Sequence, residues 1–149
     1  MLALMDCCCG LDVHKDVIHA CILKGSPDEE PVPIHAKFGA TQSDLQAMCA
    51  WLMENQCFNV AMESTGVYWR PVYEACEQFL NGYQCLMVVN AHHMRNVPGR
   101  KSDVKDSQWI ATLLRHGLLE PSFVPNRLIR NLREYSRLYR SFVQERTRY

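Results

Sequence analysis

Two kinds of hydrophobic pattern alternate along the chain and together predict an α/β fold. Apolar residues alternate with polar ones or form short unbroken runs in five segments, which is typical of strands. In four other segments they recur every three or four residues, which is typical of helices. The predicted strands are residues 5–13, 17–24, 32–38, 58–62 and 83–89, and the predicted helices are residues 45–53, 67–80, 102–116 and 126–149, with a loop at 90–101.

The connections between these segments predict the topology of the sheet. The first three strands follow one another closely, as in an antiparallel meander. Right-handed crossovers through helices should then place the fourth and fifth strands parallel to the first. Thr41, Ser102 and Asn126 are suitable N-caps, and Gly82 and Gly117 are suitable helix stops. The expected result is a mixed sheet with flanking helices and a C-terminal helix.

Composition narrows the class of protein. The chain has 149 residues, of which 48% are hydrophobic and 21% charged, as in one ordinary globular domain. A disordered chain and a collagen-like fibre are therefore excluded. No apolar stretch approaches the roughly 18 residues that a membrane span needs, so no membrane partner is expected. The N-terminus lacks the basic leader of a signal peptide, which favours a cytoplasmic location.

Charge is divided unevenly between the two ends of the chain, although the net charge is zero. Residues 1–91 contain four basic and eleven acidic residues, whereas residues 92–149 contain twelve basic and five acidic residues. A basic C-terminal part predicts an anionic partner such as nucleic acid, and a solvated arginine-rich helix face is the alternative.

Eight cysteines raise the question of disulfides or a zinc site. They include the run at residues 7–9, but no C-x-x-C pair occurs and no Cys/His group has zinc-ligand spacing. Several lie inside apolar runs, where a free cysteine packs as a small hydrophobe. We therefore expect buried structural thiols in a reducing compartment.

Four carboxylates fall where a sheet of this kind would form a site. Asp12 and Glu63 end the first and fourth predicted strands, and sites in open α/β sheets lie beyond the carboxyl ends of strands. Asp103 and Asp106 lie three residues apart near the start of a predicted helix, which would place them on one face. Helix capping alone could explain this last pair. Together the four predict a site for a divalent cation such as Mg²⁺.

Several short motifs resemble one family of transposases in order and spacing. They are GLDVHK at 10–15, MESTGVYW at 62–69, VN at 89–90, GRKSDVKD at 99–106, QWIA at 108–111, GLL at 117–119, SFVP at 122–125 and LR at 132–133. These resemble the N-terminal domain of the Asp-Glu-Asp-Asp transposases of insertion-sequence group 110 and its 1111 branch. The resemblance covers nearly the whole chain.

The resemblance implies an RNase H-like, RuvC-like fold in which Asp12, Glu63, Asp103 and Asp106 bind catalytic Mg²⁺, with Mn²⁺ able to substitute. It implies a DNA recombinase of a mobile element, and some family members use an element-encoded bridge RNA as a guide. Family members continue into a helical segment and a C-terminal transposase domain, so this chain, which ends at Tyr149, is expected to be a fragment that is incomplete for strand exchange. We divide it into a catalytic domain, residues 1–125, and the start of an arginine-rich, coiled-coil-like segment, residues 126–149.

Basic residues near the acids and in the last helix are candidates for nucleic-acid contacts. The candidates are Lys15, Arg95, Arg100, Lys101, Lys105, Arg130, Arg133 and Arg137. Tyr68 and Trp69 are candidates either for base stacking or for packing. The last helix also carries an apolar stripe, Leu128, Leu132, Tyr135, Leu138, Tyr139 and Phe142, which predicts packing on the sheet or a homo-oligomer.

Two other functions compete with a metal-dependent DNA recombinase. An actin- or sugar-kinase-like phosphotransferase shares this core but needs glycine-rich phosphate loops, and Gly10 and Gly66 are single glycines. A nucleic-acid-binding or dimerisation module without catalysis would use the acids structurally. Thermal stability distinguishes the three functions. Mg²⁺ or Mn²⁺ should stabilise a recombinase, ATP should stabilise a kinase, and neither metal nor ATP should stabilise a binding module.

Overall fold

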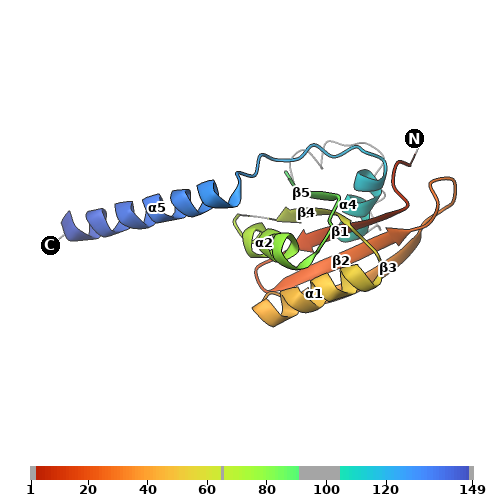
Figure 1. Ribbon diagram of the computed structural model, residues 1–149, viewed down its shortest axis with the longest axis horizontal. Helices are drawn as coiled ribbons and strands as arrows, with labels where there is room; N and C mark the ends of the chain where they lie inside the picture. Colours follow the sequence, from red (N-terminus) through yellow and green to blue (C-terminus); the bar gives the residue numbers. More distant parts are fainter. Residues whose placement is uncertain (1–2, 65, 91–104, 148–149) are drawn as a thin grey trace.

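A five-stranded mixed sheet with the order β3-β2-β1-β4-β5 forms the centre of the protein (Figure 1). The computed structural model describes residues 3–64, 66–90 and 105–147. The elements are β1 (Cys7–Val13), β2 (Val17–Lys24), β3 (Val32–Gly39), α1 (Gln42–Glu54), β4 (Asn59–Ser64), α2 (Trp69–Phe79), β5 (Cys85–Val89), α4 (Asp106–Arg115) and α5 (Arg127–Thr147).

Strand pairing follows the predicted topology. β1, β2 and β3 pair antiparallel in sequence, and β4 pairs parallel with both β1 and β5. β1 is buried along its whole length because it has a neighbour on each side and helices on both faces. After α4 the chain returns along β5, where the Ser122 N–H donates to the Val88 carbonyl at 2.7 Å. The predicted α/β fold class is therefore confirmed.

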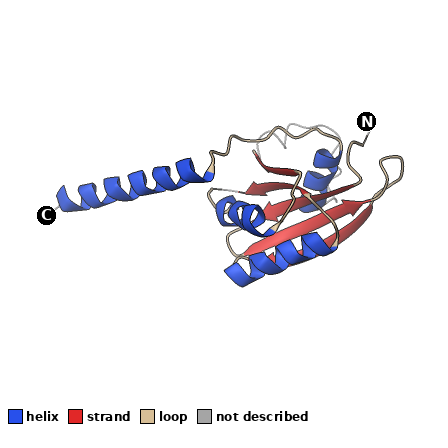
Figure 2. Cartoon of the chain, viewed as in Figure 1, coloured by secondary structure: helices blue, strands red, loops and turns tan. Residues whose placement is uncertain are grey.

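Helices cover the two faces of the sheet unequally (Figure 2). α1 and α2 pack on one face around a core that includes Leu11, Met48 and Leu80. α4 packs on the other face against a smaller core that includes Cys8 and Ala61. α5 projects away from this body as a single long helix (Figure 1). No helix in the described ranges is long and apolar enough to cross a membrane.

Local capping signals place most helix ends where the sequence predicts them. Thr41 and Asp44 form a capping box at the start of α1. Asn126 Oδ1 accepts the Ile129 N–H at 3.0 Å at the start of α5, and Gly117 follows α4 with a φ of 68°. The predicted helix 102–116 is wrong at its start, because α4 begins at Asp106 with Lys105 as its N-cap, and Ser102 lies outside the described residues. Asp106 supplies the acidic first turn that a helix N-terminus favours.

α4 approaches β1 so closely that only glycine fits at position 10. A Cβ on Gly10 would lie 2.2 Å from the Ser107 carbonyl oxygen and 2.5 Å from the Ala111 nitrogen. Non-bonded atoms cannot come this close, so the helix rests directly on the strand backbone. This contact fixes the position of the first turn of α4 over β1.

The other end of α4 is held by Arg115, whose side chain is fully buried. Its guanidinium donates to four backbone carbonyls, those of Met5 and Gly25 at 3.1 and 3.2 Å and those of Ser26 and Glu29 at 2.9 and 3.1 Å. In the part of the chain that the structure describes, no carboxylate pairs with it. These four hydrogen bonds therefore tie α4 to the segment before β1 and to the loop after β2.

The cysteines pack as the sequence predicts. All eight are free thiols and seven are buried, and Cys8 and Cys9 have no exposed surface. Burial raises the pKa of Cys8 to about 12 and that of Cys21 to about 11. These thiols are therefore protonated at neutral pH and act as small apolar side chains.

Candidate active site

Two of the predicted carboxylates lie directly opposite each other at the carboxyl ends of the central strands. Asp12 of β1 and Glu63 of β4 are partners in the parallel register. Registered residues of parallel strands point to the same face, and adjacent strands are about 4.8 Å apart. Ala61, two residues before Glu63, packs in the α4-side core, so the pair faces α4. The sheet therefore brings Asp12 and Glu63 together on one face.

Asp12 is the more buried of the two carboxylates, with 8% of its surface exposed. His14 Nε2 lies 3.0 Å from Asp12 Oδ2, within hydrogen-bonding distance. The ring of His14 also makes an edge contact with His19, whose backbone is registered with Asp12 on β2. His14 thus holds Asp12 from the solvent side, because more than half of its side chain is exposed.

Asp106 lies at the first residue of α4, on the same face of the sheet. The following residue, Ser107, lies over Gly10, and Gly10 precedes Asp12 by two residues on the same face of β1. Arg115, the last residue of α4, contacts the segment before β1. α4 therefore runs antiparallel to β1, and its first turn lies toward Asp12. The structure therefore brings Asp106 to the end of the sheet that carries Asp12 and Glu63.

Asp103 lies outside the described residues, so its place beside Asp106 stays a prediction. Within residues 3–64, 66–90 and 105–147, no three His, Cys, Asp or Glu side chains form a ready metal-binding group. Two facing carboxylates and a third at the start of the neighbouring helix are what the described part supplies.

Gly10 has a role in the site that was not predicted from the sequence. Its signal was a glycine inside an otherwise apolar strand, two residues before an acidic residue. A glycine in such a place often marks the close approach of another backbone. Here that backbone belongs to α4, which carries Asp106.

Ser64 and the aromatic pair after it have mainly structural contacts. Ser64 Oγ accepts the Trp69 N–H at 3.0 Å and so supports the start of α2. The Trp69 ring packs edge-on against Tyr73, with centroids 5.8 Å apart. Packing is therefore the observed role of Trp69, whereas Tyr68 remains 39% exposed at the N-cap of α2.

Seven of the eight predicted nucleic-acid contacts divide into three groups. Lys15, in the turn after β1, and Lys105, at the N-cap of α4, are exposed near the carboxylate end of the sheet. Arg133 and Arg137 are exposed on α5. Arg95, Arg100 and Lys101 fall in the segment 90–101 that the sequence predicts to be a loop, and they lie outside the described residues.

Arg130 requires a correction, because it is buried and not part of an exposed basic stripe. Only 4% of its side chain is exposed, and its guanidinium pairs with Glu77 and, at 3.6 Å, with Glu74. It also donates to the Pro125 carbonyl at 2.8 Å and lies over the Tyr73 ring. Arg130 therefore anchors α5 to α2 and is not available to phosphate.

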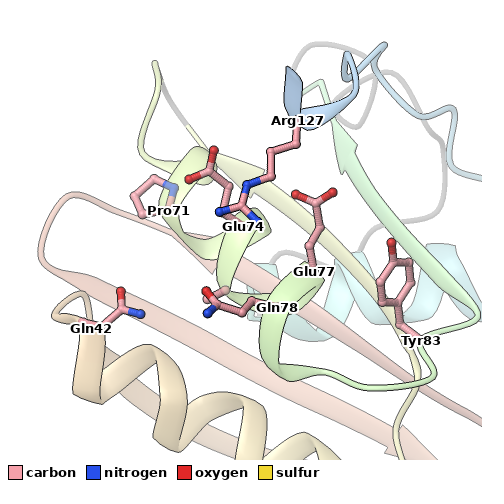
Figure 3. Close-up of a pocket in the computed structure, with 8 residues that line it drawn as sticks. Gln42, Pro71, Glu74, Glu77, Gln78, Tyr83 and Arg127 are labelled. Atoms are coloured by element: carbon pink, nitrogen blue, oxygen red, sulfur yellow. The ribbon is translucent and has the colours of Figure 1, made fainter. Parts of the chain in front are cut away.

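A pocket of about 310 Å³ beside α2 is distinct from the carboxylate site (Figure 3). Glu74, Glu77, Tyr83 and Arg127 are among the residues that line it, and Arg127 reaches toward α2 from the start of α5. It lies on the α2 side of the sheet, whereas Asp12 and Glu63 face α4. We therefore do not assign the candidate active site to it.

Comparison with known protein families identifies the family of this chain. Residues 9–149 match the model of the DEDD transposase family of the insertion-sequence 110 type, described as "Transposase". The chain belongs to this transposase family. The resemblance inferred from the sequence motifs is thus confirmed. No curated protein matches the chain.

Solved structures of RuvC share the fold of this transposase-family chain. The Thermus thermophilus RuvC in complex with Holliday junction substrate superposes with a TM-score of 0.55 at 10% identity, covering 79% of this chain and 100% of that chain. A second Thermus thermophilus RuvC structure gives 0.53 at 11% identity, covering 78% and 99%. The RuvC-like, RNase H-like fold is confirmed, and family and fold together indicate a DNA recombinase or nuclease domain.

Proposed function

We propose that this chain is a Mg²⁺-dependent catalytic domain that acts on DNA phosphodiesters during recombination of a mobile element. The observation that carries the proposal is the pair of carboxylates, Asp12 and Glu63, in register at the carboxyl ends of adjacent parallel strands. Asp106 at the start of α4 and Asp103 would complete the site. Membership of the transposase family supports the choice of DNA as substrate.

The donor set fits a hard divalent cation. Every proposed ligand is a carboxylate, and Mg²⁺ prefers such oxygen ligands to imidazole or sulfur ligands. Like charges directly opposite on adjacent strands are unfavourable, and a cation between Asp12 and Glu63 would relieve this repulsion. Mn²⁺ makes similar bonds and should substitute.

Each residue around the site has a separate role in the proposal. A cation held by these carboxylates would supply positive charge to the oxygens of the reacting phosphodiester. His14 orients Asp12 by its hydrogen bond, and Gly10 lets α4 bring Asp106 to the strands. Lys15 and Lys105 are exposed at this end and would meet the flanking DNA phosphates. A guide RNA is a further partner that the family resemblance suggests.

Metal-dependent stabilisation tests this proposal. Mn²⁺ or Mg²⁺ should raise the melting temperature of the wild type, and Asp12→Asn or Glu63→Gln should abolish the rise. Asp106→Asn should weaken metal binding while leaving the metal-free melting temperature nearly unchanged. Asp16→Asn is the matched control, because Asp16 is an exposed acid in the turn after β1. Equal metal responses in all four variants would contradict the proposal.

The phosphotransferase alternative is disfavoured by the place of Gly10. This glycine lies inside β1 with the Ser107 carbonyl directly above it, so its backbone cannot cradle a phosphate. ATP should therefore leave the melting temperature unchanged in the absence of metal.

We also propose that α5 joins two copies of the chain. Its apolar positions Leu128, Leu132, Tyr135, Tyr139 and Phe142 follow one another at alternating spacings of four and three residues, which is the heptad pattern of a coiled coil. Between 57% and 71% of each is exposed, because α5 meets its own domain through the opposite, arginine-bearing face. The alternative that this stripe packs on its own sheet is not what the structure shows.

A charge placed in the α5 stripe should separate the copies. Leu132→Glu should give a monomeric mass by light scattering at concentrations where the wild type is dimeric, because it buries a carboxylate in an apolar seam. Ser141→Glu, exposed and outside the heptad positions, is the matched control and should remain dimeric. A wild type that is monomeric at every concentration would contradict the proposal.

A further inference from the structure

A second hollow of the molecule lies between α2 and α5, and we name it the α2–α5 groove. It has a volume of about 710 Å³. Its lining combines aromatic and arginine side chains, chiefly Tyr68, Trp69, Arg70, Arg133, Glu134 and Arg137. Arginine with an exposed aromatic ring is the combination that binds nucleic-acid strands.

Ion pairs within the groove leave two of its arginines unneutralised. Arg70 donates to Glu74 and Glu134, at 3.2 and 3.1 Å, which bridges α2 to α5. Within the described part of the chain, neither Arg133 nor Arg137 pairs with a carboxylate. Both side chains are exposed, and they lie one helical turn apart on α5. Their guanidinium groups are therefore free to bind two successive anionic groups.

The aromatic residues of the groove differ in how firmly they are held. Trp69 is fixed by Tyr73, which in turn lies under the buried Arg130. Tyr68 is 39% exposed and, among the described residues, makes no ring contact. A ring of this kind can stack on a base, but only on one that is not already stacked between its neighbours in a duplex.

The groove begins at the end of the sheet that carries the carboxylates. Tyr68 follows the end of β4 by four residues, and the hydrogen bond from the Trp69 N–H to Ser64 Oγ joins the start of α2 to the end of β4. Glu63 is the residue before Ser64. A strand that leaves the carboxylate site over this edge would therefore pass Tyr68 before reaching Arg133 and Arg137.

We propose that the α2–α5 groove binds an unpaired segment of a DNA strand, with one base stacked on Tyr68 and adjacent phosphates on Arg133 and Arg137. The inference rests on the proposed function for its choice of DNA, and it adds that the substrate is held in single-stranded form beside the site. A groove for an acidic peptide would need the two arginines but not the ring.

Fluorescence anisotropy with a labelled oligo-dT strand and with a duplex of equal length, both in EDTA, tests the groove. Tyr68→Ala should weaken single-strand binding by about 5- to 150-fold, since stacking contributes roughly 1–3 kcal/mol per base. Duplex binding should change little, and Tyr68→Phe should retain single-strand affinity. Tyr83→Ala is the matched control, because Tyr83 is similarly exposed at 42% but lies before β5, outside this groove.

The arginines are tested by salt dependence on the same strand. Arg133→Gln with Arg137→Gln should reduce the slope of log affinity against log salt by about 1.4, and Arg140→Gln with Arg146→Gln should change it less. Equal losses of strand affinity in Tyr68→Ala and Tyr83→Ala would overturn the inference, and so would equal losses of affinity for the strand and for the duplex. It would also be overturned if an acidic peptide displaced the strand from the Tyr68→Ala variant and from the wild type equally well. Melting curves confirm that each variant folds.

Because strand binding is measured in EDTA, the test of the groove does not depend on the metal-dependent function. If Asp12→Asn removes the metal response while Tyr68→Ala leaves strand binding intact, only the groove is refuted. If Tyr68→Ala weakens strand binding but no variant alters a metal response, the groove survives and the metal-dependent function fails.

Discussion

Replacing Gly10 with alanine is expected to destabilise the protein and to weaken its metal binding together. The added Cβ would lie 2.2 Å from the Ser107 carbonyl oxygen, so α4 has to move away from β1. Overpacking of this kind costs about 1–3 kcal/mol, and more where backbone must shift. We expect the free energy of unfolding to fall by about 3 kcal/mol and the melting temperature by about 6–12 °C. Because α4 carries Asp106, Mn²⁺ affinity should fall as well.

The sign of this effect distinguishes close packing from ordinary strand propensity. Alanine in place of a strand glycine normally stabilises by about 0.5–1 kcal/mol. Gly66→Ala is the comparison, because a Cβ there meets no atom within 4 Å and only the φ of +61° is unfavourable, at a cost of about 1 kcal/mol. A Gly10→Ala protein as stable as the wild type would show that α4 does not rest on β1.

Arg115→Lys is expected to be the most damaging conservative substitution in the chain. The guanidinium donates four hydrogen bonds to backbone carbonyls of two segments, and an ammonium group cannot reach all of them from one point. Each buried carbonyl left unpaired costs about 1–3 kcal/mol. Urea denaturation should therefore show a loss of at least about 3 kcal/mol.

Arg140→Lys provides the control for Arg115→Lys. Arg140 is exposed on α5, where such a change should stay within about 0.5 kcal/mol. If both variants lost the same small amount, the four hydrogen bonds of Arg115 would not be a main support of α4.

The strands and their order were predictable because their signals are local and consistent. The Val17–Lys24 strand, the N-cap at Thr41 and the stop at Gly117 follow from hydrophobic alternation, capping preference and glycine conformation. The start of α4 was not predictable in the same way. Ser102 is the better intrinsic cap, but the helix begins where its contact with Gly10 begins.

The candidate site was only partly accessible from sequence. Acids after apolar runs, together with the right-handed crossover rule, suffice to place Asp12 and Glu63 at one edge of the sheet. Arg130 shows the limit of such reasoning, because its spacing matches that of Arg133 and Arg137. Only the structure shows that Arg130 forms ion pairs with Glu77 and Glu74 of α2, whereas Arg133 and Arg137 remain exposed.

The two faces of α5 were visible in the sequence, but their orientation was not. Periodicity separates an arginine face from an apolar face and does not say which one turns to the domain. The ion pairs of Arg70 with Glu134 and of Arg130 with Glu77 turn the arginine face toward α2 near the start of α5, and Arg133 and Arg137 stay exposed on it. The apolar face is thereby left for another helix.

Anomalous diffraction from crystals soaked in Mn²⁺ tests the central claim most directly. Our account predicts a manganese peak bonded to carboxylate oxygens of both Asp12 and Glu63, with Asp106 turned toward it, and no such peak in Asp12→Asn crystals soaked alike. A saturating soak that places manganese only at other acids, such as Asp16, or leaves Asp12 and Glu63 without it, would contradict the account.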